Sequence, residues 1–317
     1  MRYFFNALNA SMVFVGTVVG AGFASGKEIN LYFGAAGMFA PVISGVISGI
    51  LSILFLFLGY YGKGGFLHGK ILSKFIYTAA VISYAAMCAG SDVILARFGI
   101  KFGGVICAVI VMVAVWLGLN KILVVNNVLQ PTIIVLIGVL FFARGNYFGT
   151  GNIGVLSALF YSLMNILVAG CILEETGGKL KRKEIYMSGV ITALIMSGIT
   201  LAVYLTVKNA VGEMPLLAVA DGLGLGIVAG IVIFVAILST MLFSAYVIFS
   251  KTATKSGKLP ALLILSVISS VAVFIGFDNL VNYGYPIVSA LGFFITAFAV
   301  YVYIKEIFSR RKRMNLR

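Results

Sequence analysis

The stretch 18-VVGAGFASGKEI-29 decides how the rest of the chain is interpreted. It lies inside the first long apolar segment, yet it holds three glycines, a serine, a lysine and a glutamate. Glycine costs a helix interior about 1 kcal/mol relative to alanine, so a cluster of glycines favours a break. If the segment crosses a membrane, irregular backbone persists only where it faces protein or a water-filled cavity. The stretch therefore predicts a broken helix beside a binding site.

The composition is that of an integral membrane protein. Hydrophobic residues make up 62% of the 317 residues, and charged residues make up 10%. A soluble domain carries about 25% charged residues. Apolar runs of about 20 residues, the length that an α-helix needs to cross a bilayer, recur along the chain. We expect an all-α membrane protein with a single transmembrane domain over residues 1–317.

Glycine, proline and charged residues divide the chain into ten apolar spans. The spans are 5–35 (interrupted), 38–61, 72–96, 102–119, 122–143, 153–175, 184–207, 223–249, 259–277 and 280–307. If the N-terminus is cytoplasmic, 18 of the 23 Lys and Arg residues face the inside. The others are Lys27, Arg97, Lys101, Arg144 and Lys208. This positive-inside bias predicts ten crossings of the cell membrane with both termini in the cytoplasm.

The net charge of +14 does not require a nucleic-acid partner. The basic tail 310-RRKR-313 follows the last span. Basic residues in that position are typical of a topology anchor at the anionic inner leaflet. We expect no nucleic-acid partner.

A second candidate break lies five spans after the first. The segment 161-YSLMNILVAGCILEETGG-178 places 167-LVAG-170 where the first span has 19-VGAG-22. Acidic residues follow in both cases, Glu28 in the first and Glu174 in the second. A packing face of small residues is the alternative interpretation of either segment.

The offset of five spans predicts an inverted repeat. Because five is odd, the unit 153–307 would run through the membrane upside down relative to the unit 5–143. Interrupted helices at matching positions of two inverted halves indicate the binding site of a secondary transporter. Amides exposed at such a break would attract an anionic group and carbonyls would attract a cation.

The span 223–249 carries Ser239 and Thr240 near its middle. Serine and threonine often bond to carbonyls of the preceding turn, which would loosen the backbone at Ala236. These three residues and the carbonyls of Val18 and Ala21 could form a five-oxygen cage for Na⁺. The alternative is that both hydroxyls bond only within their own helix.

These features resemble the LeuT-type fold of the APC superfamily: ten helices, breaks in the first and sixth, and the A-x-x-S-T pattern of 236–240. The N-terminal 15-VGTVVGAGFASGKEI-29 is similar to the start of the uncharacterised YkvI-like bacterial membrane proteins. The resemblance implies a 5+5 inverted repeat with helices one and six discontinuous. In sodium-coupled members the cation site would fall on Val18, Ala21, Ala236, Ser239 and Thr240. The sixth helix lacks the paired glycines or the tryptophan of several relatives, which leaves the substrate class open.

We expect the solute to contact the break, one face of the third helix and the middle of the sixth. The candidate residues are Gly20, Ala21, Gly22, Phe23, Ser25, Gly26, Tyr84, Met87, Cys88, Asn165 and Val168. The face of the third helix mixes apolar and weakly polar groups, which suits a small zwitterion such as an amino acid. Plain helix packing is the alternative for these residues.

Ionisable residues inside spans are functional hypotheses by default. The resemblance implies that Lys27 and Asp278 pair to close an external gate. Glu28 and Asp92 are alternative partners or proton carriers. Charges that snorkel to the headgroups are the competing explanation.

The leading hypothesis is a secondary active transporter that couples Na⁺ to the symport of a small organic solute such as an amino acid. The alternatives are a proton-coupled transporter, a ligand receptor or channel resembling the germinant-sensing spore proteins, and a protein whose break serves only helix packing. The sequence has no nucleophile–base set, HExxH motif, P-loop or dinucleotide fingerprint, so we expect no enzymatic activity. The expected partners are the lipid bilayer and a small-molecule solute, with no obligate protein partner.

Overall fold

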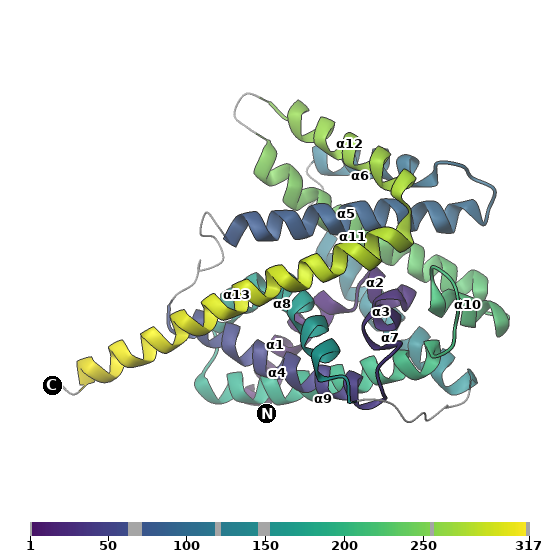
Figure 1. Ribbon diagram of the computed structural model, residues 1–317. Helices are drawn as coiled ribbons and strands as arrows, with labels where there is room; N and C mark the ends of the chain where they lie inside the picture. Colours follow the sequence, from purple (N-terminus) through teal and green to yellow (C-terminus); the bar gives the residue numbers. More distant parts are fainter. Residues whose placement is uncertain (1, 63–71, 118–121, 145–152, 254–256, 315–317) are drawn as a thin grey trace.

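The computed structural model describes residues 2–62, 72–117, 122–144, 153–253 and 257–314. Within these residues the chain is all-α, with 13 helices (Figure 1). The helices are α1 (Arg2–Val18), α2 (Ala21–Ser25), α3 (Lys27–Phe33), α4 (Phe39–Tyr60), α5 (Leu72–Ala96), α6 (Gly103–Trp116), α7 (Ile122–Arg144), α8 (Val155–Gly177), α9 (Arg182–Val207), α10 (Pro215–Gly222), α11 (Gly226–Thr252), α12 (Leu259–Ile275) and α13 (Phe277–Met314).

Six of the described helices are long and apolar enough to cross a membrane. They are α4, α5, α8, α9, α11 and the Phe277–Phe308 part of α13. The shorter apolar helices in the described part of the chain are Tyr3–Val18, Gly103–Trp116, Leu129–Arg144 and Leu259–Ile275. By length and hydropathy the protein is a multi-pass membrane protein. Ten crossings remain a prediction, because this criterion supports only the six longer helices.

The helices pack in two groups (Figure 1). In the first group α4 packs along α8 and α9, and α1 joins both. In the second group α5 contacts α6, α11 and α12. The helix α13 contacts α8 from the first group and α5 from the second, while α2 packs on α11. The broken N-terminal segment therefore lies where the two groups meet.

Glycines allow α4 to lie very close to its neighbours. A Cβ atom on Gly59 would collide with the Glu174 carbonyl of α8. A Cβ atom on Gly49 would lie 2.5 Å from the Gly189 carbonyl of α9. Association of membrane helices depends on such close backbone contact, because lipid offers apolar surfaces as good as any side chain.

The helix α8 is continuous from Val155 to Gly177. The prediction of a discontinuous sixth helix is therefore wrong in this structure. The 167-LVAG-170 segment contains one glycine among helix-compatible residues, and a single glycine costs only about 1 kcal/mol. The Asn165 side chain also donates from Nδ2 to the Tyr161 carbonyl, at 2.9 Å, within the same helix.

Polar contacts join helix starts and ends at the two ends of the bundle. At one end Lys27 pairs with Asp278. At the other end Asn6 Nδ2 donates to Glu184 Oε1 at 2.8 Å. The orientation of these ends in the cell membrane stays a prediction. Several residues on which it depends lie outside the described part of the structure, namely Lys63, Lys70, Lys121, Lys255, Arg317 and the side chains of the basic tail 310–313.

Candidate functional site

The first helix is interrupted between Val18 and Ala21. Gly20 is extended, with φ −113° and ψ −160°, and its N–H donates to the Val18 carbonyl at 2.7 Å. The Ala21 N–H donates to Thr240 Oγ1 of α11 at 3.3 Å. A Cβ atom on Gly20 would lie 3.3 Å from the same oxygen. Glycine at this position therefore leaves room for a hydroxyl of α11 against the interrupted backbone.

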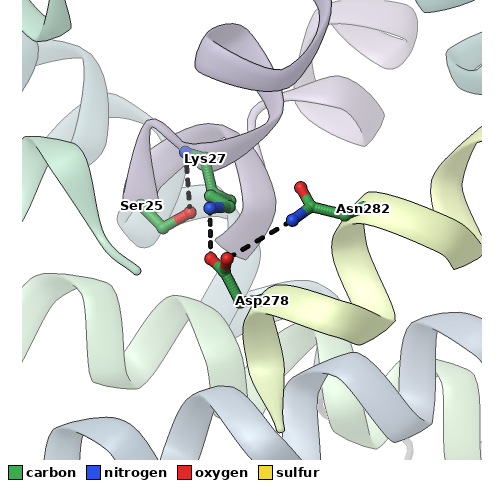
Figure 2. Close-up of polar contacts among 4 residues, drawn as sticks. All are labelled: Ser25, Lys27, Asp278 and Asn282. Atoms are coloured by element: carbon green, nitrogen blue, oxygen red, sulfur yellow. Dashed lines mark hydrogen bonds and ion pairs between the residues drawn. The ribbon is translucent and has the colours of Figure 1, made fainter. Parts of the chain in front are cut away.

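A second interruption lies at Gly26, which adopts the left-handed conformation with φ 75°. A Cβ atom there would lie 2.7 Å from Val207 Cγ1 and 3.1 Å from the Leu216 nitrogen. Ser25 holds the turn, because its hydroxyl donates to the Gly22 carbonyl at 2.8 Å and accepts the Lys27 N–H at 3.2 Å (Figure 2). Ser25 is thus engaged by the turn itself.

Lys27 and Asp278 form an ion pair between the starts of α3 and α13 (Figure 2). The Lys27 side chain is 12% exposed and the Asp278 side chain 45%. Asn282 Nδ2 also donates to Asp278 Oδ2 at 3.3 Å. The structure thus brings together the two residues that the resemblance pairs; their role as a gate remains a prediction.

Glu213, in the connection between α9 and α10, lies near the same two charges. Desolvation raises the pKa of Glu213, and the charge of Asp278 raises it further, while Lys27 lowers it. The pKa is therefore raised above the ordinary glutamate value, and this carboxyl holds its proton more tightly than an isolated one.

Asp92 has a different partner from Lys27, Asp278 and Glu213. Its Oδ1 atom accepts the Gly104 N–H at 3.1 Å, at the start of α6. An acidic side chain in this position satisfies a backbone amide that the helix cannot satisfy itself. The contact gives Asp92 a structural role at the start of α6.

Glu28 is turned into the protein and is 8% exposed. Its carboxyl occupies the space beside Gly22, where a Cβ atom would collide with it. Tyr285 of α13, Tyr32 and Tyr161 all lie near this carboxyl. Within the described residues no Lys, Arg or His lies within ion-pair distance of this carboxyl. We name Glu28, Tyr32, Tyr161 and Tyr285 the carboxyl–tyrosine cluster.

Polar residues on one face of α13 also contact α3. Ser289 Oγ lies 2.6 Å from the Tyr32 hydroxyl, and the Tyr32 and Tyr161 ring centroids are 5.6 Å apart. Sequence reasoning missed Tyr32, Tyr161, Tyr285 and Ser289. A signal was present, because Asp278, Asn282, Tyr285 and Ser289 follow the spacing i, i+4, i+7 and i+11 of one helix face.

The residues predicted to bind Na⁺ lie where α1, α2 and α11 meet. Ala21 and Thr240 are in contact, Val18 ends α1, and Ala236 and Ser239 are buried in α11. Neutral carbonyl and hydroxyl oxygens are the donors that hard cations prefer. The donor chemistry and the approach of Thr240 to the interrupted backbone therefore fit a hard cation.

The third-helix residues lie on α5 beside residues of α12 and α6. Tyr84 lies near Ser269 of α12, and Cys88 lies near Cys107 of α6. The Tyr84 hydroxyl is buried without a hydrogen-bond partner at ordinary distance among the described residues. These contacts match the helix-packing alternative. Met87 is also buried, at 1% exposed.

The remaining residues predicted to contact the solute differ in burial. Phe23 is fully buried within α2. Asn165 is buried next to Tyr161, beside the carboxyl–tyrosine cluster. Val168 is 38% exposed on the continuous α8, and its contact with a solute remains a prediction.

A recess of about 220 Å³ opens at the other end of the bundle. It lies between the first turns of α1 and the end of α8. Its lining residues are Asn6, Asn9, Ala10, Val13, Thr176, Lys179 and Leu180. A second recess, of about 400 Å³, lies beside α10 at the end of the bundle that holds the Lys27–Asp278 pair. Its lining residues are Arg144, Ala210, Val211, Ala218, Val219, Gly222 and Leu223. Both ends of the bundle are therefore hollowed.

No protein family model matches the chain. The chain is similar to a Bacillus subtilis (strain 168) protein described as "Uncharacterized protein YyaD". The two are 26% identical over 334 aligned positions, which cover 90% of this chain and 93% of that protein. The similarity indicates distant homology over nearly the whole length.

Proposed function

We propose that the protein is a secondary active transporter that moves a small organic solute, such as an amino acid, by alternating access. In this proposal the ten apolar helices form two inverted repeats of five. The packing supports it, because each group takes equivalent members of both halves: α1 and α4 with α8 and α9, and α5 and α6 with α11 and α12. Inverted repeats built in this way are typical of secondary transporters. The second break is not needed for this arrangement.

The observation that carries the proposal is the interrupted first span with Thr240 against it. Irregular backbone at membrane depth is expected only where it is buried in protein or lines a site. We propose that Val18, Ala21, Ala236, Ser239 and Thr240 supply oxygens for Na⁺. Bound there, the ion would hold α1 and α2 to α11 by charge–dipole attraction.

The ion pair between α3 and α13 supports alternating access. With both termini in the cytoplasm, the Lys27–Asp278 pair would lie on the external side and the recess beside Asn6 on the cytoplasmic side. The pair would then hold α3 against α13 on the external side. Separation of α3 from α13 would open the external path toward the interrupted backbone.

Uptake into proteoliposomes tests the proposal. The purified protein is supplied with each radiolabelled proteinogenic amino acid in turn, under an inward Na⁺ gradient and under a matched K⁺ gradient. We expect Na⁺-driven accumulation of at least one amino acid. Thr240→Val should reduce the uptake rate about tenfold, which corresponds to a loss of about 1.4 kcal/mol in the free energy of Na⁺ binding.

Thr78→Val is the matched control, because the exposed Thr78 hydroxyl donates to the Lys74 carbonyl of its own helix, at 3.0 Å. It should leave uptake unchanged. Equal rates in Na⁺ and K⁺ would remove the sodium part of the proposal. Stabilisation of the protein by an amino acid without accumulation in vesicles would favour a receptor instead.

A further inference from the structure

We propose that the Glu28 carboxyl is a proton-binding site. While α3 contacts α13 it holds a proton, and it loses the proton when α3 separates from α13. We call the protein with a proton on Glu28 the loaded state. This state follows from the surroundings of Glu28 alone. The release step rests on the proposed transport function, in which the solute path opens between these two helices.

The surroundings of Glu28 disfavour a negative charge. The side chain is buried, and transfer of an ionised carboxylate from water into an apolar environment costs several kcal/mol unless the charge is paired. The titratable groups that face it are all phenols: Tyr32 on α3, Tyr161 on α8 and Tyr285 on α13. The segment α2 contributes no titratable side chain. The adjacent ammonium of Lys27 is already paired with Asp278. The neutral carboxyl is therefore the stable form here.

The neutral carboxyl also fits the available hydrogen bonds. A protonated glutamic acid is both a donor and an acceptor, and a tyrosine hydroxyl is also both. A neutral Glu28 can therefore form a hydrogen bond with the nearby Tyr285 hydroxyl without any charge. The carboxyl lies beside Gly22, so its position is tied to the interrupted backbone.

Release of the proton follows from the position of Glu28 along the α3–α13 contact. Three polar contacts follow one another along α13: Lys27–Asp278, Glu28–Tyr285 and Tyr32–Ser289. The first is the most exposed of the three, because Asp278 is 45% exposed, whereas Glu28, Tyr285, Tyr32 and Ser289 are buried. If the Lys27–Asp278 pair opens and α3 moves away about Gly26, Glu28 loses Tyr285 and gains water. Hydration favours the ionised form, so the opening of this contact releases the proton.

Infrared spectroscopy of the purified protein in nanodiscs tests the loaded state. A protonated carboxyl gives a C=O stretching band that carboxylates lack, and the band shifts in D₂O. At neutral pH we expect this band in the wild type and its loss in Glu28→Gln, which keeps the size and the hydrogen-bonding capacity of the side chain. The control Glu175→Gln removes a carboxyl that is 79% exposed and should leave the band unchanged.

Two outcomes would overturn the loaded state: no such band in the wild type, or the same band in Glu28→Gln. Tyr285→Phe provides a second variant if Glu28→Gln folds poorly. It should shift the band, because the carboxyl loses its hydrogen-bond partner. An unshifted band would contradict the assignment to Glu28.

A transport measurement tests the release step. Proteoliposomes that contain a pH-sensitive dye are supplied with the radiolabelled amino acid mixture. We expect proton movement to accompany uptake by the wild type and to be lost in Glu28→Gln. Unchanged proton movement in Glu28→Gln would overturn the release step while leaving the transporter proposal intact. No uptake by the wild type would contradict the transporter proposal, and the infrared band would still decide whether Glu28 holds a proton.

Discussion

Two segments of the chain share a glycine motif followed by acidic residues, but only one of them is broken. Residues 18–29 contain two interruptions, at Gly20 and at Gly26. In contrast, α8 continues through Gly170 without interruption. In the first segment, neighbouring elements occupy the space that a side chain would need at both glycines. The comparison shows that a glycine motif predicts a break when it contains several glycines and when neighbouring elements occupy the space that their side chains would need.

The largest expected effect comes from Gly26→Ala. Alanine in the left-handed region costs about 1–2 kcal/mol, and the new Cβ atom would also press on Val207 and Leu216. We expect a loss of about 2–4 kcal/mol in the free energy of unfolding. Thermal unfolding in detergent measures it. The matched control is Gly198→Ala in the continuous helix α9, where a Cβ atom meets nothing within 4 Å. That variant should be neutral or more stable by up to about 1 kcal/mol, and equal effects of the two variants would contradict the comparison.

Thr240→Val should have the next largest effect. The Ala21 N–H would lose its acceptor, and an unsatisfied buried donor costs about 1–3 kcal/mol. The same substitution at Thr176 in α8 removes a hydroxyl from an exposed position and should cost less than about 0.5 kcal/mol. Denaturant titration of both variants measures the difference. The account of the break fails if Thr176→Val is as destabilising as Thr240→Val.

A double-mutant cycle of Lys27→Gln and Asp278→Asn should give a coupling energy of about 1 kcal/mol, because the Lys27 end of the pair is shielded from water. The control pair is Lys179 and Glu175, whose charged atoms are 4.0 Å apart on a fully solvated helix end with side chains 78% and 79% exposed. Its coupling should be close to zero. Thermal unfolding of the four proteins in each cycle measures both values. Equal couplings would show that the pair beside the break has no special strength.

The smallest effect concerns pH. The pKa of Glu213 is raised in the folded protein, so the folded state binds this proton more tightly than the unfolded chain does. The resulting stabilisation is complete below the ordinary glutamate pKa and is lost as the pH rises through the raised value. Glu213→Gln should therefore flatten the dependence of thermal stability on pH over this window. Glu175→Gln should not change this dependence. Identical profiles for the wild type and Glu213→Gln would show that burial and the charges of Lys27 and Asp278 do not affect Glu213.

The sequence predicted the features that depend on local chemistry. The all-α membrane class follows from apolar length, and the interruption of the first span follows from Gly20, Gly22 and Gly26. The continuity of α8 could not be predicted as readily, because a segment with one glycine can be helical or broken, and its packing against other helices decides which. The carboxyl–tyrosine cluster was missed because Tyr285 lies more than 250 residues after Glu28 and reaches it only through the contact between α3 and α13.

The most direct test of the central claim is the thermal stability of the purified protein titrated with NaCl against KCl at constant ionic strength. The claim is that the interrupted backbone and Thr240 form a cation site. It predicts saturable stabilisation by Na⁺ over K⁺ that is present in Thr176→Val and absent in Thr240→Val. Identical unfolding temperatures in Na⁺ and K⁺ for the wild type would contradict it.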